Sequence, residues 1–167
     1  MTIILITGGA KSGKSARAEA RATALAGKPV YIATAEALDA EMRERIAKHR
    51  ARRGTEWIEH ETPLELVTAL NATDGGGARL VDCLTLWLSN LMDAQRDWLQ
   101  QATQLVEALR AQKSPVVLVT NEVGLGIVPD NALARQFRDA AGTMNQMIAQ
   151  AADEVEFVVA GLPMRVK

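Results

Sequence analysis

The start of the chain constrains its fold more than any other segment. An apolar run, Ile3–Ile6, passes almost directly into Gly8-Gly9-Ala10-Lys11-Ser12-Gly13-Lys14-Ser15. Such a run is typical of a strand buried on both faces of a parallel sheet. The segment after it matches the phosphate-loop pattern G-x-x-x-x-G-K-[ST] in full, and a helical pattern follows. Glycines let backbone N–H groups point inward, and a helix N-terminus adds partial positive charge, so we predict a nucleoside triphosphate site here.

The same motif predicts a magnesium ion beside the triphosphate. Lys14 can reach the β and γ phosphates, and the Ser15 hydroxyl can ligate Mg²⁺. Such sites also use an acid at the end of a neighbouring strand to hold the ion through water. Asp82 ends a short strand pattern and is the first candidate, while Glu122 follows another strand and is the second. Either carboxylate could instead cap a helix or be a solvated loop acid; position after a strand favours Asp82, and the two readings of Glu122 are evenly balanced.

Strand and helix patterns alternate along the chain. This alternation predicts an α/β fold: a P-loop nucleotide-binding domain, single over residues 1–167, with a mainly parallel sheet flanked by helices. The segment Asn121–Pro129 is predicted as a loop, and Asp130 as the N-cap of the last helix. The predicted strands are Ile3–Ile6, Val30–Thr34, Trp57–Ile58, Arg79–Asp82, Pro115–Thr120 and Val155–Val159, and the predicted helices are Lys14–Leu25, Asp39–Arg52, Pro63–Leu70, Leu84–Met92, Trp98–Gln112 and Asp130–Ala151.

Composition excludes several classes of function. Lys and Arg number 19 against 20 Asp and Glu, so the net charge of −1 does not support a nucleic-acid partner or a polybasic membrane anchor. The one cysteine, Cys83, excludes an internal disulfide framework and a Cys-rich zinc site. No apolar stretch approaches the roughly 20 residues of a membrane span. The start lacks the basic region of a signal peptide, so we expect a cytoplasmic protein.

Two histidines are present, and His49 is the more informative. It lies near the apolar stripe of the predicted helix, three residues after Ile46, and is followed by the basic segment Arg50–Arg53. Spacing alone favours a partly buried structural histidine before a solvated basic helix end. The alternative is a neutral imidazole that attacks a phosphoryl group while arginines balance the phosphate charge. His60 lies between two glutamates, which favours a surface role.

Further segments complete a recognisable set: Thr7–Ser15, Tyr31–Ala35, Met42–Ile46 leading to His49, Trp57 with Glu61 and Pro63, Thr120–Pro129, Leu133–Asp139 and Ala152–Val155. In this order, and spread over essentially the whole chain, they resemble the bifunctional adenosylcobinamide kinase/adenosylcobinamide-phosphate guanylyltransferase family. Many families share the phosphate loop. The Thr-Asn-Glu-Val-Gly-x-Gly-Ile-Val-Pro segment and Arg-Ile-x-x-His are far more specific.

The resemblance implies two reactions. ATP or GTP phosphorylates adenosylcobinamide, and GTP then transfers GMP to the product through a GMP-histidine intermediate, giving adenosylcobinamide-GDP and pyrophosphate. The resemblance places that histidine at His49 and implies a homotrimer. The phosphate-loop motif described above assigns Mg²⁺ to Ser15 and Asp82. The implied nucleotide contacts are Gly8, Gly9, Ala10, Lys11, Ser12, Gly13, Lys14, Ser15, Ala33, Thr34, Ala35, Arg50, Ala51, Arg52, Arg53, Glu61 and Asp82.

Two positions depart from the family pattern. Lys11 stands where arginine is common, which keeps the charge but loses the planar fork, and Asp82 stands where some relatives have glutamate. Two other functions are compatible with the motifs. One is a P-loop small-molecule kinase without a covalent intermediate, and the other is a non-catalytic GTP-binding protein. Labelling of the protein by GTP would separate the first of these from the family's chemistry.

Overall fold

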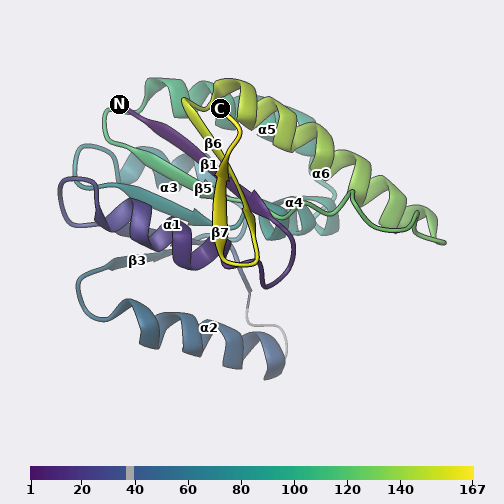
Figure 1. Ribbon diagram of the computed structural model, residues 1–167. Coiled ribbons are helices and arrows are strands. Elements are labelled where there is room, and N and C mark those ends of the chain that lie inside the picture. The colour runs from purple at the N-terminus through teal and green to yellow at the C-terminus, as the bar shows by residue number, and fades with distance from the viewer. Residues whose placement is uncertain (37–39) are drawn as a thin grey trace.

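A seven-stranded sheet forms the centre of the molecule, in the order β3-β2-β4-β5-β1-β6-β7 (Figure 1). The computed structural model describes residues 1–36 and 40–167; the side chains of Glu41, Met42, Arg45, His49 and Arg52 lie outside the described set. All neighbouring strands are parallel except β6 and β7. The predicted α/β class is therefore confirmed. The strands are β1 (Ile3–Gly8), β2 (Val30–Ala33), β3 (Ile58–Glu61), β4 (Arg79–Asp82), β5 (Val116–Val119), β6 (Glu154–Val159) and β7 (Leu162–Arg165).

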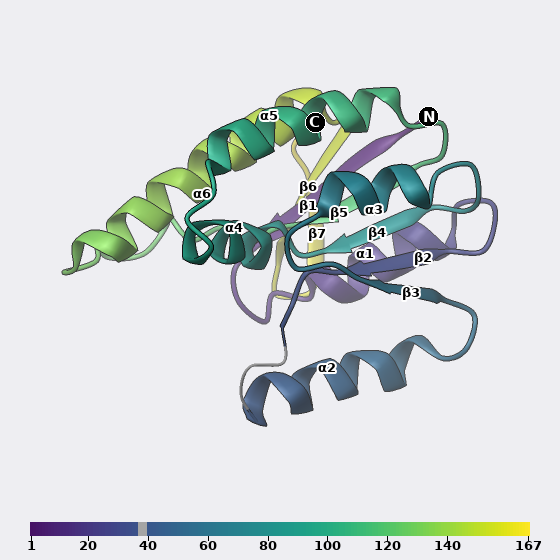
Figure 2. The ribbon, with the colours of Figure 1, turned by 180° about the vertical axis from the view of Figure 1, so that it is seen from behind.

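Helices cover both faces of the sheet (Figures 1 and 2). Helix α1 (Lys14–Thr23) buries Ala18 and Ala22 against one face. The opposite face carries α3 (Leu66–Ala72), α4 (Leu84–Asp93), α5 (Trp98–Ala111) and α6 (Ala132–Ala151), whose apolar residues form the larger core cluster. Both views place α2 (Ala40–Arg53) beyond the β3 edge of the sheet. No helix in the described part of the chain is both long and apolar enough to cross a membrane.

Most predicted elements are present with shifted ends. Helix α3 begins at Leu66 instead of Pro63 and ends at Ala72 instead of Leu70. Helix α6 begins after Asn131, whose side chain accepts a hydrogen bond from the Ala134 amide at 2.7 Å. The prediction of Asp130 as N-cap was therefore wrong by one residue, because both neighbours are good capping residues and sequence does not decide between them. The predicted start of α2, Asp39, lies outside the described residues.

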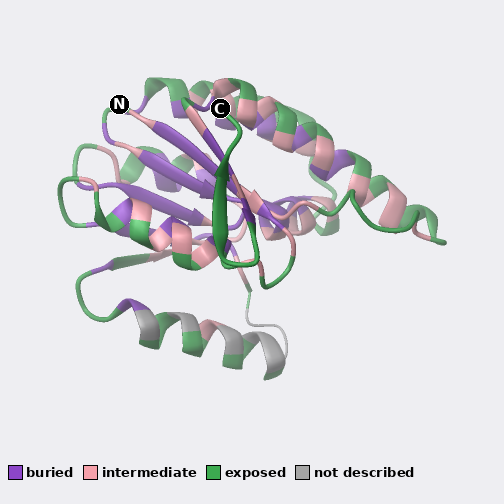
Figure 3. Cartoon of the chain, in the orientation of Figure 1, coloured by how far each residue is buried: buried purple, intermediate pink, exposed green. Residues whose placement is uncertain are grey.

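Strand β7 was not predicted. The predicted last strand ends at Val159 and is followed by Gly161 and Pro163; in the structure the chain turns at Ala160 and Gly161 and returns antiparallel to β6. Both turn residues have positive φ, 50° and 79°, as a two-residue hairpin turn requires. Pro163 is compatible with β7 because an edge strand has one side without ladder hydrogen bonds. Figure 3 shows this hairpin as exposed along β7.

A buried carboxylate fastens α1 to the sheet. Glu156 on β6 accepts hydrogen bonds from Arg17 Nε at 2.7 Å and Arg17 Nη2 at 2.8 Å, and from Arg21 Nη1 at 2.7 Å. Arg21 also binds the more exposed Glu154 at 2.8 Å. The hydrogen bonds from Arg17 hold the pKa of Glu156 below its ordinary value, against the opposing effect of burial. The ion pairs thus hold α1, the helix that follows the phosphate loop, to β6, the neighbour of β1.

We predict that Glu156→Gln lowers the free energy of unfolding by about 2 kcal/mol at pH 7, since it removes charge-assisted bonds from a buried site. Because the folded-state pKa of Glu156 is depressed, its contribution is present above the ordinary value of 4.5 and is lost as the pH falls below it. Denaturant unfolding from pH 7 to pH 3 should show the two proteins converge. The control Glu154→Gln, at a more exposed pair, should cost less than about 1 kcal/mol. A pH-independent difference for Glu156→Gln would contradict the assignment.

Candidate active site

The phosphate loop joins β1 to α1 at the carboxyl edge of the sheet. Lys11 and Gly13 have positive φ, 55° and 96°, which turn the backbone back on itself. The Ser12 amide donates to Gly9 O at 3.2 Å, and the Lys14 ammonium donates to the same oxygen at 3.0 Å. The N-cap of α1 is Gly13, which has no side chain that could cap the first amides of the helix. The first amides of α1 therefore keep the character of an anion-binding helix N-terminus.

Neighbouring backbone supports this loop from two sides. The Gly161 amide in the β6–β7 turn donates to Ser12 O at 2.8 Å, and the Glu122 amide after β5 donates to Gly8 O at 3.0 Å. The Ser12 hydroxyl is buried and has no hydrogen-bond partner among the described residues. A buried hydroxyl without a partner in a glycine-rich loop before a helix N-terminus fits a phosphate oxygen. All predicted residues from Gly8 to Ser15 are thus brought together.

The end of β2 carries three more predicted contacts, Ala33, Thr34 and Ala35. The Thr34 side chain is fully buried: its hydroxyl donates to Cys83 O at 2.7 Å and accepts from the Cys83 amide at 2.9 Å. This hydroxyl joins the ends of β2 and β4, while Ala33 and Ala35 are half-buried beside it. Burial raises the pKa of Cys83 to about 11, so its thiol is neutral at pH 7 and is a poor nucleophile.

Asp82 ends β4 at the same edge of the sheet. It is half-buried, and its Oδ2 accepts a hydrogen bond from the Tyr31 hydroxyl at 3.1 Å. The Lys14 ammonium lies close enough to lower the pKa of the adjacent Cys83, which places the end of β4 near the phosphate loop. Ser15 and Asp82 offer oxygen donors, the chemistry that suits Mg²⁺, an ion that usually keeps waters and takes substrate phosphate oxygens. The residues present therefore fit a magnesium ion bound together with a triphosphate.

The backbone amide of Glu122 donates to Gly8 O and places this residue beside the phosphate loop. Its Oε1 accepts a hydrogen bond from the Gly124 amide at 2.6 Å. A polar network fixes the residue before it. The backbone amide of Asn121 donates to Thr85 Oγ1 at 2.7 Å, and the backbone carbonyl of Asn121 accepts from Asn145 Nδ2 at 3.2 Å. Sequence reasoning missed Thr85 and Asn145. The one available signal was a polar residue on the apolar stripe of each helix, which buried positions allow only when the polar group is paired.

The basic segment at the end of α2 divides into two kinds of arginine. Arg53 is buried, with its guanidinium carbon 3.5 Å from the centre of the Tyr31 ring, and it donates to Glu59 Oε1 at 2.6 Å. Arg50 is 47% exposed and forms ion pairs with Glu59, at 2.6 Å, and with Glu61. Burial alone would raise the pKa of Glu59, but the hydrogen bonds from Arg53 and Arg50 hold it below its ordinary value.

These contacts give the two arginines different properties: Arg53 is a fixed anchor, whereas Arg50 can exchange its carboxylate partners. The buried Arg53 fixes the end of α2 on the sheet by stacking and charge pairing. The exposed pairs of Arg50 are worth little individually, so a phosphate can replace a carboxylate there at small cost. Arg50 and Glu61, both predicted contacts, lie together, and Ala51 is exposed between the two arginines. His49 lies in α2 one turn before Arg53, but its side chain and that of Arg52 are outside the described set.

The site and the fold define a class. A buried parallel strand, a phosphate loop, a helix N-terminus and an acid at the same sheet edge are the parts of a P-loop nucleotide-binding protein. The fold resembles that of the P4 protein from bacteriophage phi6, whose structure contains ADP, with a TM-score of 0.54 and 14% identity over 97% of this chain and 52% of that one. At this identity the likeness concerns the fold alone.

Sequence relatives identify the family. Residues 4–166 match the family "cobinamide kinase / cobinamide phosphate guanyltransferase", and the chain belongs to it. It is 50% identical over 98% of its length, and 96% of the other chain, to the bifunctional adenosylcobalamin biosynthesis protein CobP of Pseudomonas aeruginosa. It is 42% identical, over 99% of both chains, to CobU of Salmonella typhimurium. The protein is accordingly a bifunctional kinase and guanylyltransferase of adenosylcobalamin biosynthesis, as the resemblance implied.

We predict that Gly13→Ala destabilises the phosphate loop. A Cβ there would lie 3.0 Å from Gly161 Cα, and φ at Gly13 is +96°, a conformation that alanine adopts only with strain. Thermal unfolding without nucleotide should show a loss of at least about 1 kcal/mol. Gly9→Ala is the control, because a Cβ at Gly9 meets nothing within 4 Å and its φ is not positive. Equal stability of the two variants would contradict the supporting role of the β6–β7 turn.

Proposed function

We propose that one phosphate loop serves both reactions and that His49 carries GMP between donor and acceptor. The observations that support this most directly are an intact phosphate loop at the carboxyl end of β1 and a helix, α2, in which Arg50 follows His49 in the sequence and Arg53 packs on Tyr31 of β2. The kinase step uses ATP or GTP and adenosylcobinamide, and the second step uses GTP. These donors are cytosolic metabolites, so the proposal places the enzyme in the cytosol.

In the kinase step the acceptor hydroxyl oxygen attacks the γ-phosphorus, and its proton is released to water. The bond from the γ-phosphorus to the β–γ bridging oxygen breaks, and the nucleoside diphosphate leaves. Lys14 and the amides of residues 8–15 hold the β and γ phosphates, which stabilises charge as it develops. Mg²⁺, when held by Ser15 and Asp82, would neutralise the charge of the phosphate chain. Glu122, beside the loop, is the second candidate for this acid, although its contact with Gly124 aims one oxygen back at its own segment.

In the guanylyl step a neutral imidazole nitrogen of His49 attacks the α-phosphorus of GTP. The bond to the α–β bridging oxygen breaks, and pyrophosphate leaves. A phosphate oxygen of adenosylcobinamide phosphate then attacks the same phosphorus and releases the histidine. Adjacent cationic arginines favour the neutral imidazole and stabilise the charge on the transferring group. Arg50 is suited to this task because its present partners are exposed.

We predict that His49→Ala abolishes covalent labelling by GTP carrying radioactive α-phosphate, because the proposal assigns the bond to GMP to this imidazole. The label on the unaltered protein should be stable in base and labile in acid, as a phosphoramidate is. His60→Ala is the matched control, since His60 is the other histidine of the chain, and it should label like the unaltered protein. Transfer of γ-phosphate to adenosylcobinamide should persist in His49→Ala. Label taken up by His49→Ala would overturn the assignment of the nucleophile.

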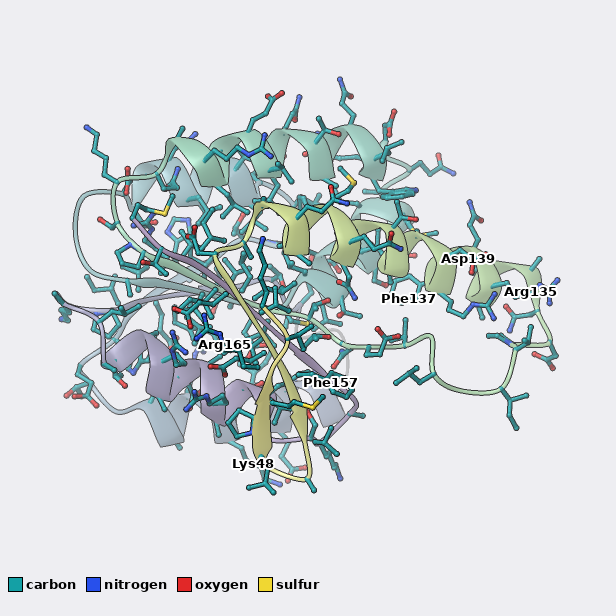
Figure 4. The ribbon with its side chains drawn as sticks, turned by 45° about the horizontal axis from the view of Figure 1, so that its top comes forward. Lys48, Arg135, Phe137, Asp139, Phe157 and Arg165 are labelled. Atoms are coloured by element: carbon teal, nitrogen blue, oxygen red, sulfur yellow. The ribbon has the colours of Figure 1, made fainter. Side chains whose placement is uncertain are left out.

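We also propose that the chain forms a homotrimer. Large apolar side chains are exposed on the segment that leads into α6, including Leu125 at 81% and Ile127 at 98%. The first half of α6, with Arg135, Phe137 and Asp139, projects beyond the sheet (Figure 4). Several large exposed apolar side chains in one short segment are typical of an interface. The family resemblance supplies the number of subunits.

We predict a mass by light scattering of about three times the 18.0 kDa chain. Ile127→Asp should shift the protein toward the single chain, because a carboxylate buried in an interface costs several kcal/mol. Leu99→Asp is the control: Leu99 is also exposed, but on α5 and not on this segment. A single-chain mass for the unaltered protein at micromolar concentration would contradict the proposed assembly.

A further inference from the structure

A chain of three side chains joins the end of α2 to the acid at the end of β4. The Arg53 guanidinium stacks on the Tyr31 ring, with 3.5 Å from its central carbon to the ring centre. On the other side the Tyr31 hydroxyl donates to Asp82 Oδ2 at 3.1 Å. Tyr31 thus touches both the anchor of the helix that carries His49 and the carboxylate assigned to Mg²⁺.

The Tyr31 ring has little freedom to move. It is 6% exposed and packs edge-on against Trp57, with ring centres 6.1 Å apart and planes at 83°. Strand register places Tyr31 beside Leu80, and Ala33 beside Asp82, so Tyr31 and Asp82 lie on the same face of neighbouring strands, two residues apart along the sheet. A tyrosine side chain is long enough to cover that distance along the strand. Stacking, edge packing and register together fix where the hydroxyl lies.

Because the ring is held between Arg53 and Trp57, the Tyr31 hydroxyl that donates to Oδ2 has a defined position. One oxygen of Asp82 is therefore held by a rigid neighbour.

We propose that Tyr31 is a positioning residue for the metal–nucleotide site: by holding Oδ2 of Asp82, it orients the carboxylate toward the ion that accompanies the triphosphate. This rests on the proposed role of Asp82. Groups that hydrogen-bond a metal-binding carboxylate set its orientation, and their removal costs about 10- to 100-fold in metal affinity or activity. The proposal gives Tyr31 no contact with the nucleotide, so its effect on metal binding passes through Asp82.

The test uses the full-length protein with a non-hydrolysable GTP analogue and Mn²⁺ as a probe for the magnesium position. Electron paramagnetic resonance measures free Mn²⁺ and gives its affinity for the complex without catalysis. Tyr31→Phe keeps the ring for Arg53 and Trp57 but removes the hydroxyl. It should weaken Mn²⁺ binding about 10- to 100-fold, raise the Mg²⁺ concentration needed for half-maximal kinase rate, and leave the rate at saturating Mg²⁺ close to that of the unaltered protein.

Two parallel variants separate the possible failures. Asp82→Asn should weaken Mn²⁺ binding at least as much as Tyr31→Phe; if it does not, the proposed role of Asp82 is wrong. If Asp82→Asn weakens binding and Tyr31→Phe binds Mn²⁺ normally, the positioning role of Tyr31 is overturned while that of Asp82 stands. Trp87→Phe is the control for a structural effect, because it removes a buried aromatic hydrogen bond, Nε1 to Leu64 O at 2.9 Å, at another place. It should lower the melting temperature without changing the Mn²⁺ affinity.

Discussion

The phosphate loop depends on backbone hydrogen bonds from segments far away in the sequence. Ser12 O accepts from the β6–β7 turn, and Gly8 O accepts from the residue after β5. These bonds need β1 to lie between β5 and β6, so the order of the strands is a condition for the shape of the loop. The ion pairs of Glu156 hold α1 in place behind it. The anion-binding geometry is therefore a property of the whole sheet edge.

Helix α2 combines a fixed end with exchangeable groups. Arg53 is buried over Tyr31, whereas Arg50 is exposed and paired with Glu59 and Glu61. The nucleophile proposed on α2 needs a stable attachment, and the proposed phosphate-binding groups need partners that they can release. The two arginines meet these two needs separately. Through Tyr31 the attachment of α2 also reaches Asp82, so the proposed elements of both reactions share one buried contact.

Local signals predicted much of this molecule. The run Ile3–Ile6 with the phosphate loop predicted β1, α1 and the nucleotide site, since strand, loop and helix are contiguous. Strand β7 was missed because Gly161 and Pro163 both resemble an end signal, and only pairing with β6 makes them a hairpin. The contact of Tyr31 with Asp82 depends on the register of β2 with β4, which no local pattern contains. Spacing alone favoured a structural role for His49; the family-specific segments reversed that preference.

The most direct test of the central claim follows both reactions in one mixture. The protein is incubated with GTP, Mg²⁺ and adenosylcobinamide, and pyrophosphate and the corrinoid products are measured over time. We predict that adenosylcobinamide phosphate appears first and that adenosylcobinamide-GDP then forms with one pyrophosphate for each molecule. Hydrolysis of GTP without any corrinoid product, or corrinoid phosphate that accumulates with no pyrophosphate release, would contradict the claim that this chain performs both transfers.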